Sequence, residues 1–259
     1  YDGATRVNEF KQMVMSLHEH GISVVMDVVY NHVYDASKFC FNNIVPGYFS
    51  RVNSNTSGCG NDTASEREMV RKYIVESVLY WHQEYHIDGF RFDLVGLLDV
   101  ETINQIVDEV HKVYPSVIFY GEGWDMDDTN KEPGTEMAKQ GNASKTPGFA
   151  YFSDNMRNLL AGDNGKTTGF VSGAADQEAA LVSNYMANPW WTNNPNQVVQ
   201  YVSCHDNHTL VDKLIKSTGR SGLDADIIKM NNLTAAIYLT SQGIPFIHAG
   251  EELLREKLD

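Results

Sequence analysis

The sequence predicts an α/β protein with parallel strands, either a β/α barrel or a doubly wound sheet. Helical patterns alternate with strand patterns along the 259 residues, and the strand patterns are short apolar runs. Polar residues follow most of these runs, as expected where parallel strands open into functional loops. The predicted strands are residues 22–29, 89–93, 117–120, 149–152, 198–203 and 244–249.

Local patterns predict the elements of the N-terminal part. Residues 6–20 place apolar side chains on one helical face, and Gly21 ends that helix. Residues 22–29 are apolar and rich in β-branched side chains, which is typical of a strand covered on both faces. Residues 34–64 are rich in Asn, Ser and Gly without periodicity, and a loop of this length usually serves a function.

The helices of the middle and C-terminal parts follow from caps and periodicity. Ser65 and Glu68 have the spacing of a capping box, which predicts a helix from Ser65 onward. Asp99 is predicted to cap the helix that Pro115 ends. Further helices are predicted at residues 156–160, 177–186 and 227–241, and polar loops at 125–148 and 187–196. The last loop carries Trp190 and Trp191, which either pack within the loop or stack on a substrate.

The composition of the chain argues against several classes of binding partner. The net charge of −14 argues against nucleic acid and anionic membranes and is compatible with a neutral substrate such as a carbohydrate. No apolar run has the length of a membrane span, so no membrane partner is expected. The sequence has no GxGxxG, GxxxxGK[ST] or HExxH motif and no clustered Cys/His spacing, which argues against nucleotide and zinc sites.

The three cysteines are too few for a disulfide framework. Cys40 and Cys59 lie in one predicted loop, where they would pair in an oxidising compartment and stay free in a reducing one. We favour free thiols, and with them the cytoplasm. An extracellular protein is the alternative if an upstream segment carries an export signal. Cys204 is expected to be an inert buried thiol.

The stretch DGFRFD at residues 88–93 is predicted to be a buried strand that carries an acid to a pocket. Alternation places Phe90 and Phe92 on one side and Arg91 and Asp93 on the other. An arginine beside a carboxylate favours its ionised form and fixes its direction, which a nucleophile requires. The alternative is a structural Arg–Asp pair at a strand end.

Polar side chains occupy the C-terminal ends of several predicted strands: Asn31 and His32, Asp93, Glu122, His205 and Asp206, and His248. In a parallel barrel these ends meet at one face. Glycoside hydrolysis needs two carboxyl groups across a pocket, one ionised and one holding a proton. Arg91 favours Asp93 as the nucleophile, and Glu122, with no cation nearby in the sequence, suits the role of acid.

Four segments resemble the ordered signature regions of the α-amylase superfamily of glycoside hydrolases. They are DVVYNH at 27–32, GFRFDLVG at 89–96, YGEGW at 120–124 and SCHDN at 203–207. The segments GEGW, HDNHTL and, at 55–66, NTSGCGNDTASE further resemble type I pullulanases, which cleave α-1,6 branches. The resemblance extends from residue 6 to residue 252.

The resemblance implies a role for each matching residue. Asp93 is implied to be the nucleophile, Glu122 the general acid/base and Asp206 the third acid, which binds the sugar hydroxyls and stabilises the oxocarbenium-like transition state. The residues implied to bind substrate are His32, Arg91, Trp124, His205 and Asn207, and those implied to be structural are Asp27 and Asn31. The implied substrate is pullulan, glycogen or a branched starch dextrin. No cofactor and no metal ligand are implied as required, although a calcium ion remains open.

The resemblance also implies a partial TIM (β/α)8 barrel, with residues 1–259 as an incomplete catalytic barrel domain holding strands three to eight. Strands one and two are expected upstream, and the eighth helix and a β-domain downstream. An unclosed barrel exposes strand edges and apolar surface, so we expect the segment alone to be poorly soluble or inactive. Val211 stands where a tryptophan is expected to border the sugar site.

Two alternatives remain open for the function. An α-1,4-acting amylase or neopullulanase would share the catalytic acids, and the pullulanase-like segments favour α-1,6 cleavage over it. A non-catalytic carbohydrate-binding relative would normally have lost an acid, whereas all three acids are present. A retaining mechanism places the Asp93 and Glu122 carboxyl groups roughly 5–5.5 Å apart.

Overall fold

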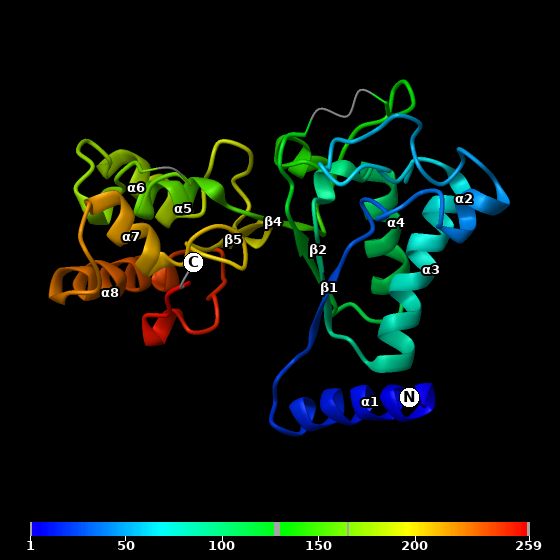
Figure 1. The fold of residues 1–259 in the computed structure, drawn as a ribbon, viewed down its shortest axis with the longest axis horizontal. Coiled ribbons are helices and arrows are strands. Elements are labelled where there is room, and N and C mark those ends of the chain that lie inside the picture. Colours follow the sequence, from blue (N-terminus) through cyan, green and yellow to red (C-terminus); the bar gives the residue numbers. More distant parts are fainter. Residues whose placement is uncertain (1, 127–129, 165, 258–259) are drawn as a thin grey trace. The chain divides into compact units, whose positions relative to one another are not determined.

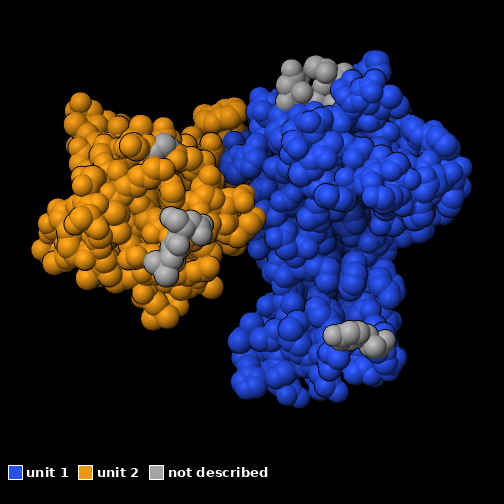
Figure 2. All heavy atoms as spheres, viewed as in Figure 1, with its two compact units in different colours: residues 1–151 blue, residues 152–259 orange. Residues whose placement is uncertain are grey.

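The computed structural model describes residues 2–126, 130–164 and 166–257, so part of the predicted loop 125–148 lies outside the described residues. The chain forms two compact units, residues 1–151 and 152–259, which Figure 2 colours separately. Both units contain helices between parallel strands, and every described strand pair is parallel, which confirms the α/β class. The single incomplete barrel domain stays a prediction.

Four successive parallel strands organise the first unit. Its elements are α1 (Gly3–Glu19), β1 (Val25–Val28), α2 (Cys40–Ile44), α3 (Glu68–Tyr85), β2 (Gly89–Phe92), α4 (Val100–His111), β3 (Ile118–Gly121) and β4 (Ala150–Phe152), whose last residue belongs to the second unit. The register places Val25 opposite Gly89, and Gly89 opposite Ile118. Helices α3 and α4 lie side by side next to these strands (Figure 1).

The alternation predicted for β2 is present in the structure. Phe90 and Phe92 are both fully buried, and the Phe90 ring stacks on Phe119 of β3 with 5.9 Å between ring centroids. Arg91 and the following Asp93 are hydrogen-bonded to each other, so they project together as expected. One face of β2 therefore builds the core of this unit, while the other presents charged groups.

Two local predictions for the first unit were wrong. The side chains of Ile22 and Val29, at the two ends of the predicted strand 22–29, are 52% and 54% exposed, so that strand is not covered along its whole length. The helix predicted from Ser65 begins at Glu68, because the Ser65 hydroxyl oxygen accepts the backbone N–H of Asp99 at 3.0 Å and does not cap.

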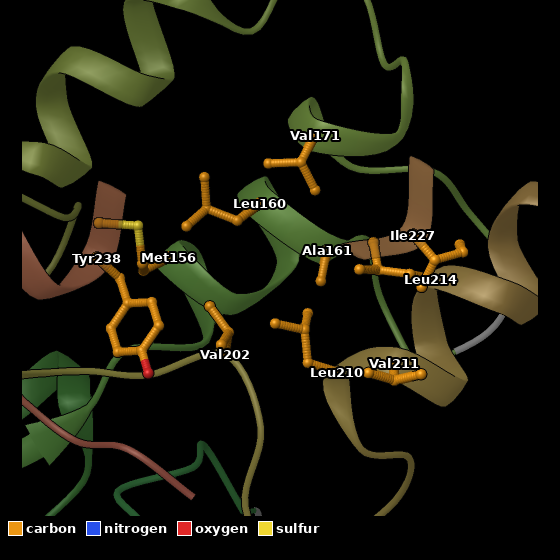
Figure 3. Close-up of a cluster of buried hydrophobic side chains, with 10 residues drawn as sticks. All are labelled: Met156, Leu160, Ala161, Val171, Val202, Leu210, Val211, Leu214, Ile227 and Tyr238. Carbon is orange, nitrogen blue, oxygen red and sulfur yellow. The ribbon is translucent and has the colours of Figure 1, made fainter. Parts of the chain in front are cut away.

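The second unit is built around one strand pair and an apolar cluster. Its elements are α5 (Asp154–Ala161), α6 (Glu178–Tyr185), β5 (Val198–Gln200), α7 (Leu210–Thr218), α8 (Ala225–Thr240) and β6 (Ile244–Pro245), and β5 pairs with β6. Side chains of α5, α7 and α8 meet in the cluster drawn in Figure 3: Met156, Leu160, Ala161, Val171, Val202, Leu210, Val211, Leu214, Ile227 and Tyr238.

Helix α7 was not predicted from the sequence. Its signals are nonetheless local: the Thr209 side chain accepts the backbone N–H of Asp212 at 3.2 Å, and Gly219 ends the helix with φ of +68°. Within the described part of the chain, none of the helices combines the length and apolar character that a bilayer crossing needs.

Candidate active site

Asp93 follows directly after β2 and forms hydrogen bonds with three other residues. Its backbone N–H donates to the carbonyl of Val28 on β1 at 3.0 Å, which fixes where the chain leaves the strand. Arg91 Nη1 donates to Asp93 Oδ1 at 3.1 Å, and Asn31 Nδ2 donates to Asp93 Oδ2 at 2.9 Å. Since both carboxylate oxygens accept hydrogen bonds, the direction of the carboxylate is set before any substrate arrives.

Arg91 links three carboxylates at the ends of three neighbouring strands. Its Nη1 atom lies 2.9 Å from Asp27 Oδ1 and 3.1 Å from Asp93 Oδ1, and its Nη2 atom lies 2.7 Å from Glu122 Oε1. Burial of Arg91 opposes its charge, but the facing carboxylates of Glu122, Asp27 and Asp93 outweigh burial and raise the pKa of the guanidinium. Arg91 is therefore a permanent cation between the acids.

Glu122 follows β3 and is 5% exposed. Its Oε1 atom contacts Arg91 Nη2, and its Oε2 atom accepts the backbone N–H of Leu94 at 3.2 Å. Glu122 has no cation nearby in the sequence, but Arg91 reaches it from the adjacent strand. Contact with Arg91 thus does not distinguish nucleophile from acid, and that assignment rests on the resemblance of the motifs.

The long loop after β1 supports His32 and Asn31. The Nδ1 atom of His32 is hydrogen-bonded to Asn31 Oδ1, and the backbone N–H of Thr63 donates to the Asn31 carbonyl at 2.9 Å. His32 also forms an isolated antiparallel bridge with Asp62. The predicted functional loop therefore packs directly beside two of the candidate site residues.

Asp62, which the sequence interpretation did not single out, organises this loop. It is fully buried and accepts the Ser54 and Ser57 hydroxyls and the backbone N–H groups of Thr56 and Ser57. Burial alone would raise the pKa of Asp62, but these hydrogen bonds lower it below its usual value. The signal in the sequence is the run of Ser and Thr residues shortly before an acid in residues 55–66.

Trp124 is half-buried, and its backbone lies against the turn after Asp93. The backbone N–H of Gly96 donates to the Glu122 carbonyl at 3.2 Å, and a Cβ atom on Gly96 would lie 2.3 Å from the Trp124 carbonyl oxygen. Only glycine permits this approach, because a real Cβ atom needs more than 3.0 Å. Gly96 in the GFRFDLVG motif therefore sets how closely the segments after β2 and β3 pack.

Replacing Gly96 with alanine is expected to lower the free energy of unfolding by about 1–3 kcal/mol, since the added methyl group must separate the two backbones. Chemical denaturation of the whole protein that contains this chain measures this change. Gly222→Ala is the matched control, because a Cβ atom there meets nothing within 4 Å. An unchanged midpoint for Gly96→Ala would contradict the close approach.

The remaining candidate site residues lie in the second unit, after β5. His205 Nε2 and Asp206 Oδ1 are 3.4 Å apart, and the two side chains are 59% and 57% exposed. Asp206 and Asn207 line a small hollow together with Arg157 and Lys213, two cations that the sequence interpretation missed. Burial is the main reason that the pKa of Lys213 is lowered.

The structure does not test the predicted meeting of the three acids around one cavity. Asp93 and Glu122 belong to residues 1–151, whereas Asp206 belongs to residues 152–259. Convergence of the three acids therefore stays a prediction. The described residues contain no group of three or more His, Cys, Asp or Glu side chains arranged to hold a metal ion, and the question of calcium stays open.

Several other positions bear on expectations drawn from the sequence. Val211, which stands where a tryptophan was expected to border the sugar site, is 1% exposed and packs in the apolar cluster of Figure 3. Trp191 is 8% exposed and its Nε1 atom donates to Asn155 Oδ1 at 3.2 Å, which indicates loop packing, whereas Trp190 is 72% exposed. Cys40 and Cys59 are exposed thiols, and Cys204 is only half-buried, so the expectation that it is a buried thiol was wrong.

Several known proteins that resemble this chain in sequence and structure are pullulanases. The pullulanase of Bacillus subtilis (strain 168) is 40% identical over 270 residues, which cover 99% of this chain and 37% of that protein. Pullulanase 1, chloroplastic, of Arabidopsis thaliana is 32% identical over 320 residues, covering 98% of this chain and 33% of that protein.

The solved structures that resemble this chain include several pullulanases. Pullulanase from Anoxybacillus sp. LM18-11 complexed with maltotetraose superposes with a TM-score of 0.94 at 40% identity, covering 99% of this chain and 38% of that one. Pullulanase from Paenibacillus barengoltzii in complex with maltohexaose and α-cyclodextrin gives a TM-score of 0.93 at 43% identity, with 98% and 41% coverage. The chain thus spans less than half the length of these relatives.

The family match agrees with the four motifs found in the sequence. The family model described as "Alpha amylase, catalytic domain" matches residues 34–257, which include all the candidate site residues except Asp27, Asn31 and His32. Those three lie in the DVVYNH segment just before it, and the pullulanase alignments cover 97% to 99% of the chain in the B. subtilis and Streptococcus pneumoniae proteins. On this evidence, the chain belongs to the α-amylase catalytic domain family of glycoside hydrolases.

Proposed function

We propose that the protein containing this chain is a retaining, debranching hydrolase that cleaves α-1,6-glucosidic bonds in pullulan, glycogen or branched dextrins. The observation that carries the proposal is that Arg91 holds Asp93 and Glu122 together at the ends of two adjacent strands. Two carboxyl groups fixed on rigid strands next to each other are what a double-displacement mechanism requires. The maltooligosaccharides bound in the solved pullulanase structures support an α-glucan as the substrate.

The proposed reaction proceeds in two steps. Asp93 attacks the anomeric carbon while Glu122 donates a proton to the departing glycosidic oxygen, which leaves a covalent glycosyl–Asp93 ester. Glu122 then removes a proton from water, and the water oxygen attacks the same carbon to release Asp93. Asn31 and Arg91 keep the Asp93 carboxylate aimed during both steps. Asp206 would stabilise the positive charge that develops on the sugar ring.

The test is product analysis with pullulan as the substrate of the natively expressed protein. Maltotriose as the sole product supports α-1,6 cleavage, and release of the α-anomer, followed by NMR, supports retention. Products other than maltotriose would favour an α-1,4-acting hydrolase instead. Binding of maltotriose without any turnover would favour a non-catalytic relative.

A further inference from the structure

The segment after β6 forms hydrogen bonds with the turn that carries Asp206. This segment contains a short 3-10 helix (Glu251–Leu253) and ends, within the described residues, at Lys257. The Lys257 ammonium donates to the carbonyl of His205 at 2.7 Å and also to the carbonyl of Asn207. These two carbonyls flank Asp206, so a single cation holds the backbone on both sides of the acid.

The backbone of this turn needs such support. Asn207 has φ of +58°, in the left-handed region, which asparagine adopts more readily than most other non-glycine residues. A residue in this region persists where its surroundings fix it. The bond from Lys257 to the Asn207 carbonyl acts directly on this residue.

A second contact from the same segment holds the start of the turn. Glu251 is 5% exposed, and its two carboxyl oxygens accept the hydroxyls of Ser203 and Tyr238, each at 2.7 Å. Burial raises the pKa of Glu251, and hydrogen bonds from the two hydroxyls oppose that shift. Residue 251 therefore holds residue 203, and residue 257 holds residues 205 and 207, so the backbone is fixed on either side of Asp206.

Lys257 is itself anchored. Its backbone N–H donates to Asp212 Oδ2 at 2.8 Å, and the same oxygen accepts the Thr209 hydroxyl at 2.8 Å in the first turn of α7. A lysine stem has many rotamers, so a fixed backbone reduces the number of places where its ammonium can go. The contacts at 205 and 207 thus start from a fixed point on the helix that follows the turn.

We infer that Lys257 is a positioning residue for Asp206, an inference that rests on the proposed function. Lys257 acts through the backbone of residues 205–207 and holds the Asp206 carboxylate where the developing charge of the transition state needs it. Misplacing a catalytic group by about 1 Å can lower the rate roughly 100-fold. Because the developing charge depends on the position of Asp206 more than the bound sugar does, loss of Lys257 should lower kcat more than it weakens substrate binding.

The experiment compares Lys257→Met, Lys257→Arg and the control Lys229→Met in the natively expressed protein, with pullulan as substrate. Lys229 lies on α8 with a side chain that is 79% exposed, so its loss should leave kcat unchanged. Lys257→Met is expected to lower kcat about 100-fold with KM within about threefold of the unmodified protein. Lys257→Arg keeps a cation with N–H donors and should recover at least about tenfold of that loss.

A binding measurement separates positioning from a general loss of structure. In Lys257→Met, affinity for a cationic iminosugar that mimics the transition state should fall in parallel with kcat, while affinity for maltotriose stays unchanged. If that variant is too unstable to assay, the same measurements are made on Lys257→Gln, which keeps an N–H donor on a shorter side chain and should show the same split.

The outcomes keep the inference and the proposed function apart. An unmodified protein that does not turn over pullulan overturns both. An active protein whose Lys257→Met or substitute Lys257→Gln variant keeps the native kcat overturns the inference alone, and so does an equal loss of maltotriose and iminosugar affinity. A selective loss of kcat that Lys257→Arg partly restores supports it.

Discussion

Replacing Asp93 with asparagine is expected to lower kcat on pullulan by roughly 10⁴-fold or more, the size of effect seen when a nucleophile is removed. An amide cannot form the glycosyl ester, so the first step of the proposed reaction is blocked. The shape of the side chain is kept, and its one carbonyl oxygen can still accept from Arg91, although the NH2 group that replaces Oδ2 can no longer accept from Asn31. Binding of maltotriose, measured by calorimetry, should therefore survive.

Two matched substitutions define the specificity of this effect. Asp108→Asn changes an exposed carboxylate on α4 and should leave kcat unchanged. Asp27→Asn removes the negative charge of another acceptor of Arg91 Nη1, on a side chain that is 58% exposed, and should cost much less than Asp93→Asn. A glycosyl adduct trapped on any residue other than Asp93 would overturn the assignment of the nucleophile.

Replacing Arg91 with methionine is expected to lower the free energy of unfolding by about 3–5 kcal/mol, the cost of removing one partner from a buried ion pair. The Arg91 side chain is 8% exposed and that of Glu122 is 7% exposed, so the loss leaves a buried carboxylate without its cation. Chemical denaturation measures the change, and turnover should fall as well because Asp93 loses one of its two side-chain donors.

Exposed arginine pairs provide the comparison. Arg6 and Glu9 form a pair whose side chains are 62% and 52% exposed, so Arg6→Met should change the free energy of unfolding by no more than about 1 kcal/mol. Arg91→Lys keeps the charge but cannot reach Asp27 and Glu122 with two separate nitrogens, and should be intermediate. If Arg91→Met had the same free energy of unfolding as the unmodified protein, the contacts of Arg91 with the three carboxylates would not stabilise the fold.

Much of the fold was predictable because it follows from periodic patterns. The predicted strands 89–93, 117–120 and 149–152 agree with β2, β3 and β4 within one residue at each end, since apolar runs between polar loops define them. Helix α4 begins where Asp99 caps it, as predicted. Helix α7 was missed because HDNHTL was interpreted only as a site motif, although Thr209 is an ordinary helix cap.

The sequence by itself determined the α/β class, the strands that carry the acids and, through four motifs, the glycoside hydrolase family. The tertiary structure alone decided the long-range contacts around those acids: Arg91 reaches Glu122 across a strand pair, and Lys257 reaches the carbonyl of His205, next to Asp206, from 52 positions away. The physical reason is that periodicity fixes the direction in which a side chain projects, whereas its neighbours depend on which distant segments pack beside it.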